Sequence, residues 1–244
     1  EGYWLENVIV EGNNITCTTR TAAQLSGRGI LLGVTDKGGA VNEVCRNITI
    51  KNNNIHDLDL TNTYFNNSGN AYRTGAIIVA CSNITNEVRN VEISDNKIWN
   101  CNGYYHAGIR VSGGNFVGNL KITGNQIDTI TSVGGVGGHG IWIGGVSSLP
   151  SSKSIIMGNM IKNTDGSGVY LDAIPVTGYI TDVSNTMVAN NMILSATTYG
   201  INIGGGAAAT SCLVIGNVVV DAGTAILNNG TTTLIRSNIG ISDS

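Results

Sequence analysis

The chain has 244 residues and a formal net charge of −3, with 41% apolar and only 12% charged residues. Disordered chains are rich in charge and poor in apolar residues, so this composition excludes disorder. No Lys/Arg cluster occurs, and no apolar run approaches the roughly 18 residues of a membrane span, so we expect neither a nucleic-acid nor a membrane partner. The 34 Gly and 31 Asn interrupt Val, Ile and Leu at high frequency, which is typical of many short strands.

One pattern recurs along the chain: an alternating strand, a two-residue turn that ends in Asn, and a second apolar alternation. In chain order it reads NVIVEGNNI (7–15), NITIKNNNI (47–55), NVEISDNKI (90–98), NLKITGNQI (119–127), KSIIMGNMI (153–161), NTMVANNMI (185–193), SCLVIGNVV (211–219) and the partial TTLIRSNI (232–239). The turn residues are Asn13, Asn53, Asn96, Asn125, Asn159, Asn191, Asn217 and Asn238. We call the strand before the turn strand B and the strand after it strand C.

A second motif stands between successive repeats and predicts a third strand, strand A. Its instances are GILLG (29–33), GAIIV (75–79), GIRVS (108–112), GIWIG (140–144), GVYLD (168–172), GINIG (200–204) and the weaker AILNN (225–229). Strands this short cannot bury an apolar face alone, so identical units must stack and share one interior. Stacking at the strand spacing of about 4.8 Å superimposes the turn asparagines, whose side chains can then bond along a column. Asn also tolerates the left-handed backbone that a tight corner requires.

The sequence therefore predicts an all-β fold, a parallel β-solenoid of about seven coils with an Asn ladder. The Asn column and the Gly-Ile strands, from Asn7 to about Ile241, resemble the right-handed parallel β-helix or pectate-lyase-like family. The resemblance implies one single-stranded β-helix domain over residues 1–244. The Gly/Asn/Thr-rich composition and the lack of a leader look most like a phage tail spike or appendage fragment. Because no capping helix is found, we expect a piece of a longer chain or association with other chains.

The longest connections lie on either side of strand A in the first five coils, which favours a binding groove over that strand. Period-2 alternation predicts that one residue near the centre of each strand A points outward. These outward residues are Leu31, Ile78, Arg110, Trp142, Tyr170, Asn202 and Ile226. An exposed column of Arg110, Trp142 and Tyr170 suits sugar binding, since sugar rings have apolar faces. The alternative is packing under a loop or against another subunit.

Asp172 ends the same strand as Tyr170, and Asp165 lies across a short loop, so these two carboxylates are the catalytic candidates. Glycosidases use such pairs. Asp172 could instead only cap the strand end. Substrate-binding candidates are Arg110 for an anionic sugar, Trp142, Tyr170, Asn202, and His139 as a proton-transfer group or a plain surface histidine. His139 follows a glycine-rich loop that lacks the strand–turn–helix context of a phosphate site. No metal spacing occurs among the five Cys, and we expect no metal and no cofactor.

Four outward aliphatic positions of strand B, Ile155, Met187, Leu213 and Leu234, predict a covered face. A tail-spike-like protein would cover it as a homotrimer.

Two functions remain open on the sequence. The first is an extracellular or virion-borne β-helix that recognises, and as a lyase or glycoside hydrolase cleaves, a bacterial or plant-type polysaccharide. The second is a non-catalytic receptor-binding or structural segment of a viral or cell-surface appendage. The Arg110–Trp142–Tyr170–Asp172 group favours the first, and the lack of a carboxylate cluster favours the second.

Overall fold

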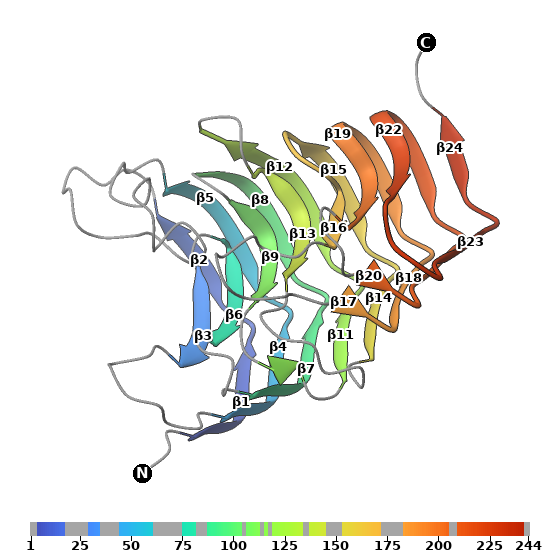
Figure 1. The fold of residues 1–244 in the computed structure, drawn as a ribbon. Helices are drawn as coiled ribbons and strands as arrows, with labels where there is room; N and C mark the ends of the chain where they lie inside the picture. Colours follow the sequence, from blue (N-terminus) through green and yellow to red (C-terminus); the bar gives the residue numbers. More distant parts are fainter. Residues whose placement is uncertain are drawn as a thin grey trace.

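A computed structural model describes residues 4–17, 29–34, 44–60, 75–81, 87–103, 106–112, 115–116, 119–133, 137–144, 153–171, 183–204 and 209–241. These residues form strands and no helix, so none of the described segments is a candidate membrane-spanning helix. All described strand pairs are parallel, and the strands stack from one end of the molecule to the other (Figure 1). The architecture is all-β and consistent with a parallel β-helix.

The strands that precede the turn asparagines form one sheet in sequence order, which we call face B. Its members are β1 (Trp4–Glu11), β4 (Val44–Lys51), β7 (Glu87–Ser94), β11 (Leu120–Thr123), β14 (Ser154–Met157), β18 (Thr186–Ala189), β21 (Leu213–Ile215) and β23 (Leu234–Arg236), with β10 (Asn115–Phe116) beside β7. The sequence repeat thus sets the stacking order directly.

The strands that follow the asparagines line up in the same order as face C. They are β2 (Asn14–Cys17), β5 (Asn54–Leu60), β8 (Lys97–Gly103), β12 (Gln126–Ser132), β15 (Met160–Thr164), the first half of β19 (Met192–Ile203), the first half of β22 (Val218–Asn228), and β24 (Ile239–Ile241).

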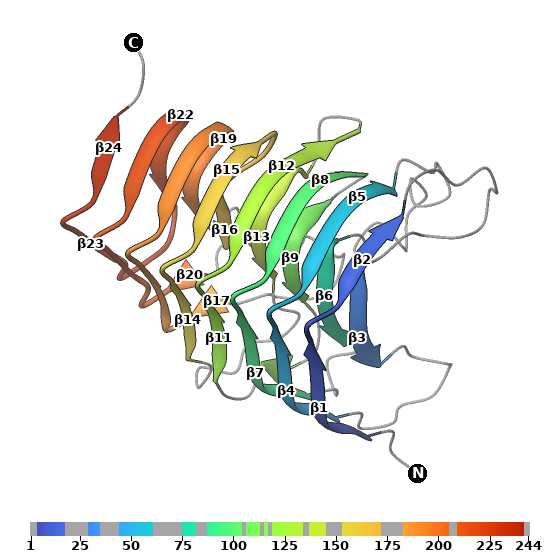
Figure 2. The ribbon, with the colours of Figure 1, turned by 180° about the vertical axis from the view of Figure 1, so that it is seen from behind.

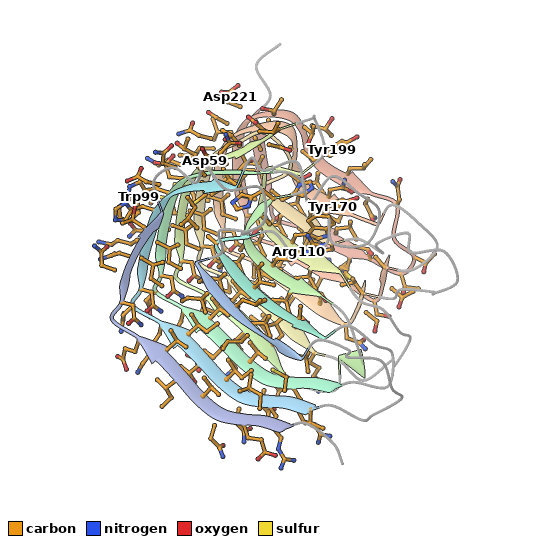
Figure 3. The ribbon with its side chains drawn as sticks, turned by 90° about the vertical axis from the view of Figure 1, so that its left-hand side faces the viewer. Asp59, Trp99, Arg110, Tyr170, Tyr199 and Asp221 are labelled. Atoms are coloured by element: carbon orange, nitrogen blue, oxygen red, sulfur yellow. The ribbon has the colours of Figure 1, made fainter. Side chains whose placement is uncertain are left out.

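The Gly-Ile segments form face A, which joins face C because β19 and β22 run through both. Face A contains β3 (Ile30–Val34), β6 (Ile77–Cys81), β9 (Ala107–Ser112), β13 (His139–Gly144), β16 (Val169–Leu171) and the second halves of β19 and β22. A separate two-stranded sheet pairs β17 (Val183–Ser184) with β20 (Ala209–Thr210). Viewed along the stack, apolar side chains of the three faces fill the interior (Figure 3).

The predicted asparagine ladder is confirmed at every step. Each ladder Asn donates a side-chain N–H to the Oδ1 of the next at 2.8–3.0 Å, from Asn13 through Asn238. The same Oδ1 accepts the backbone N–H of the preceding ladder Asn. The other side-chain N–H reaches a face B carbonyl of the repeat before, as Asn125 does to Ile93. The ladder therefore fixes which strand residues lie opposite one another.

The left-handed residue of this corner is not the ladder Asn but the residue before it. Gly12, Asn52, Asp95, Gly124, Gly158, Asn190, Gly216 and Ser237 all have φ between 51° and 71°. Only Gly, Asn and Asp adopt this backbone readily, which explains why the first turn position is almost always one of the three. The sequence analysis predicted the position of this corner correctly. It assigned the left-handed backbone to the ladder Asn, which is one residue too late.

The glycine that opens each strand of face A is required by a close approach. A Cβ on Gly140 would lie 2.6 Å from the carbonyl oxygen of Gly168 and 2.4 Å from Cγ2 of Ile161. Gly108 and Gly168 face the same conflict with the repeat that follows each of them. The Gly-Ile motif thus marks where the backbone crosses directly over an interior isoleucine or valine of face C.

Candidate functional site

The predicted column on face A is confirmed as a set of neighbours. Arg110 of β9, Trp142 of β13, Tyr170 of β16 and Asn202 of β19 are successive partners across parallel strands. Figure 3 shows Arg110 and Tyr170 close together, with Trp99 of face C on the far side of the stack. The last predicted member was wrong, because Leu227 rather than Ile226 pairs with Asn202.

The expected exposure of this column was also wrong. Arg110 is fully buried, Trp142 and Asn202 are buried, and Tyr170 is half-buried. The side chains cover one another: the Arg110 guanidinium carbon lies 4.1 Å from the centre of the Trp142 ring, and the Trp142 and Tyr170 rings are 5.6 Å apart. Such a cation–π contact is strongest when it is removed from water.

His139 joins the group as a third ring. Its imidazole stacks on Tyr170 at 4.4 Å and meets Trp142 edge-on at 5.1 Å. The backbone N–H of Ser167 donates to His139 Nδ1 at 3.0 Å, so the ring is neutral with its proton on Nε2. Burial and the positive charge of Arg110 lower the pKa of His139 to about 3. His139 is therefore a neutral hydrogen-bond donor in this site and not a surface histidine.

His106 stands at the entrance to strand A in the same way as His139, and it also belongs to the group, although it is not among the site residues predicted from the sequence. Its ring is fully buried, and burial together with the charge of Arg110 lowers its pKa to about 3. The signal was present in the sequence, because a histidine stands just before the Gly-Ile motif in both YYHAGIRV and GGHGIWIG. We name Arg110, His106, His139, Trp142, Tyr170 and Asn202 the face A cluster.

Several polar atoms of the cluster have no hydrogen-bond partner among the described residues. They are both ring nitrogens of His106, the indole Nε1 of Trp142 and the side-chain oxygen of Asn202. Buried polar groups are almost always satisfied, and each unsatisfied one costs about 1–3 kcal/mol. A neutral imidazole has one donor and one acceptor, so these atoms supply two donors and two acceptors that a polar ligand or ordered water would complete.

Asp165, one of the two catalytic candidates, is exposed at the edge of the cluster. Its carboxylate accepts the backbone N–H of Ser132 at 2.8 Å, and the neighbouring Gly166 donates its N–H to the Gly138 carbonyl. Gly166 itself has no room for a side chain, since a Cβ there would lie 2.6 Å from Nδ1 of His139. Asp165 thus ties together the turns that hold His139. Asp172, the other candidate, lies outside the described residues.

A separate aromatic pair lies on face C. The rings of His56 and Trp99 stack in parallel at 4.3 Å, and His56 Nδ1 lies 2.7 Å from the Asp57 carboxylate. Asp128, the next residue of that column, pairs with Lys162 at 2.8 Å. On face B, Glu92 and Lys121 lie opposite each other, but the Glu92 carboxylate accepts a hydrogen bond from the Ser94 hydroxyl. Most of these groups are partly buried, and the ring pair and the Asp128–Lys162 pair each join neighbouring strands.

The described residues contain no group of three or more His, Cys, Asp or Glu side chains that could hold a metal ion. Comparison of the sequence with models of protein families, and with curated protein sequences, finds no match.

Proposed function

We propose that this protein is a right-handed, single-stranded parallel β-helix of about seven coils that recognises a bacterial or plant-type polysaccharide through face A. The proposal places it outside the cell or on a virion, in the manner of a tail spike or fibre. Support comes from the repeat pattern, the parallel register and the asparagine ladder.

The observation that carries the proposal is the composition of the face A cluster. Two aromatic rings, a guanidinium and two neutral imidazoles lie on neighbouring strands or just before them, and several of their polar atoms have no described partner. Sugar rings combine an apolar face with a rim of hydroxyl groups, so they suit aromatic rings flanked by donors and acceptors. The half-buried Tyr170 is the ring of the cluster that a sugar would meet first, since Trp142 is buried beneath its neighbours. A rigid sheet holds these groups in position without a further ordering cost on binding.

Recognition is the function that the described residues favour over cleavage. The one carboxylate placed at the cluster edge, that of Asp165, already accepts a backbone N–H. Cleavage by a polysaccharide lyase or glycoside hydrolase, with Asp172 and Asp165 as the acid and base, stays a prediction. The alternative function is that of a non-catalytic receptor-binding or structural segment. In that case the Asp172→Asn variant and the wild type would both leave every polysaccharide uncleaved.

The experiment is a binding screen of the purified protein against surface polysaccharides, followed by two matched variants. Tyr170→Ala removes a half-buried ring of the cluster, whereas Trp99→Ala removes a larger ring from face C. One ring contact is worth about 1 kcal/mol, so Tyr170→Ala should weaken binding about fivefold and Trp99→Ala should not. Binding that survives Tyr170→Ala and is lost with Trp99→Ala would place recognition on face C and reject the proposal.

Cleavage is tested on the same polysaccharides by following reducing ends and unsaturated products. Product formation that stops with Asp172→Asn and Asp165→Asn, while binding persists, would assign both carboxylates to catalysis. Binding without any product, in a protein that binds well, would leave recognition as the whole activity.

A further inference from the structure

All four methionines of the chain lie at the asparagine-ladder corner, in two neighbouring repeats. Met157 and Met160 stand on either side of one turn, and Met187 and Met192 stand on either side of the next. Figure 2 shows the bends of successive repeats side by side along one edge of the molecule, with β14 below the bend and β15 and β19 above it. The thioether groups of the chain are therefore concentrated at one level of one edge.

Three of these methionines point outward and are accessible. Met157, Met160 and Met192 are 39%, 41% and 42% exposed, whereas Met187 is half-buried. Met160 and Met192 are partners across parallel strands, so their side chains start about 4.8 Å apart in one column. Beyond its chain neighbours, no atom would lie within 4 Å of a Cβ on Gly158, so the space over the turn between Met157 and Met160 is open. The methionine side chain has three rotatable bonds, which lets the three sulfur atoms converge there.

The positions next to these three methionines carry no charge. Their partners on the adjoining strands are Thr123, Ala189, Gln126 and Val218. Calcium and magnesium ions require several oxygen ligands, and zinc is bound by thiolates, imidazoles or carboxylates, so the group suits none of these ions. Thioethers are soft and neutral, and soft sulfur ligands of this kind select copper(I).

We infer that Met157, Met160 and Met192 form a binding site for copper(I), a soft monovalent cation, on the outside of the ladder corner. The site uses none of the cysteine and histidine spacings from which the sequence predicted no metal. It also does not rest on carbohydrate recognition, because the three methionines lie on faces B and C and the proposed sugar site lies on face A.

The pH dependence of binding separates thioether ligands from thiols. Cys45, Cys101 and Cys212 are free and buried, and burial raises the pKa of Cys101 to about 12 and also raises that of Cys212. A thiol must lose a proton to bind a metal, whereas a thioether has none to lose. Binding through the methionines should therefore be the same at pH 7 and pH 5, while binding through one thiolate would weaken about 100-fold over this range.

The test is a titration of the protein with silver(I), a redox-stable probe of copper(I) sites, followed by NMR of the methionine methyl groups. Reactive thiols are blocked beforehand with N-ethylmaleimide. The chain has four methionines, so each methyl signal can be assigned with one Met→Leu variant. The signals of Met157, Met160 and Met192 should shift together and saturate at one silver ion per chain, at both pH values.

The variants use an exchange that conserves side-chain volume and is well tolerated in folded proteins. Even the outer partners of metal ligands are worth about 10–100-fold in affinity, so Met160→Leu or Met192→Leu should weaken silver(I) binding at least about tenfold. The matched control is Met187→Leu, the same exchange at the same corner, which should leave binding unchanged.

Four results would each overturn the inference. They are the absence of any shift, separate midpoints for the three signals, a loss of binding at pH 5, and equal weakening by Met187→Leu and Met160→Leu. Separate midpoints would mean that exposed thioethers take up silver(I) one by one, without a common site.

Discussion

At the scale of single residues, the ladder asparagines show why one amide side chain per repeat is enough to hold the corner. Asn125 accepts from the backbone and the side chain of Asn96, and donates to Asn159 and to the carbonyl of Ile93. Asparagine supplies two donors and a two-fold acceptor in a compact planar group, and every one of these is used. Aspartate would lack the donors, and glutamine would be one carbon too long for the corner.

Replacing Asn125 with Ala should lower the free energy of unfolding by about 1–3 kcal/mol, because the donors of Asn96 are left buried without an acceptor. Denaturant unfolding measures this. Asn13→Ala is the internal control: Asn13 is exposed at the end of the ladder, and no described donor reaches its side-chain oxygen. Equal losses at the two positions would contradict a buried, cooperative ladder.

The two buried histidines make stability depend on pH. In the folded protein their pKa values are lowered to about 3 by burial and by Arg110, below the ordinary value of 6.5 expected when unfolded. Between pH 6.5 and about 3 the unfolded chain therefore binds protons that the folded chain does not. The contribution of the histidines to stability is complete above the unfolded pKa and is lost progressively as the pH falls.

The melting temperature should thus fall steadily from pH 7 to pH 4, and His106→Leu should reduce the slope by removing one of the two groups. Thermal unfolding monitored by circular dichroism at a series of pH values gives both slopes. A wild-type melting temperature that rises on acidification over this range would contradict a neutral, buried histidine pair.

At the scale of elements, the glycine at the start of each face A strand decides how closely neighbouring repeats approach. Gly140→Ala should destabilise the protein by about 1–3 kcal/mol, because its methyl group would overlap the Gly168 carbonyl and the Ile161 side chain. Gly158→Asn, at the left-handed turn position, should be almost neutral, since nothing lies within 4 Å of a Cβ there and Asn52 and Asn190 occupy equivalent positions. Unfolding curves of the two variants separate steric crowding from a general effect of replacing glycine.

The order and register of the elements could be predicted from the sequence because the ladder fixes them. Asn96 and Asn125 are bonded through their side chains, so residues at equal distances from these two asparagines must lie opposite each other on neighbouring strands. Lys121 therefore lies opposite Glu92, because each stands four residues before its ladder Asn.

The prediction failed at the last strand of face A, where the motif is weak. Between Ala222 and Thr224 the chain has one residue fewer than between Ala196 and Tyr199, so that Leu227 and not Asn228 lies opposite Asn202. The motif AILNN (225–229) already aligns Leu227 with Asn202, and the prediction took Ile226, which is one residue too early and pairs with Ile201.

The composition of the face A cluster was largely predictable, but its burial was not. Alternation along a strand states which side of the sheet Arg110 and Trp142 lie on, and says nothing about what covers that side. His106 precedes the strand, so the alternation could not assign it to the cluster, although it stands at the entrance to strand A as His139 does. Its burial and the effect of the Arg110 charge on its pKa become visible only in the folded structure.

At the scale of the whole molecule, the faces differ in the side chains that they carry. Face A holds aromatic rings, imidazoles and a buried cation on or beside neighbouring strands, whereas the exposed large apolar side chains of the described residues lie mostly on faces B and C.

Recognition of a polysaccharide through face A is tested most directly by the fluorescence of Trp142 during titration with a polysaccharide that the protein binds. The chain has three tryptophans, so Trp4→Phe with Trp99→Phe leaves Trp142 alone. Recognition through face A predicts that the Trp142 emission shifts in this variant along the binding curve, because a sugar displaces water or completes the bond of the indole N–H. An emission that stays constant while the polysaccharide binds would contradict recognition through face A, the more so if the signal of a Trp99-only variant changes instead.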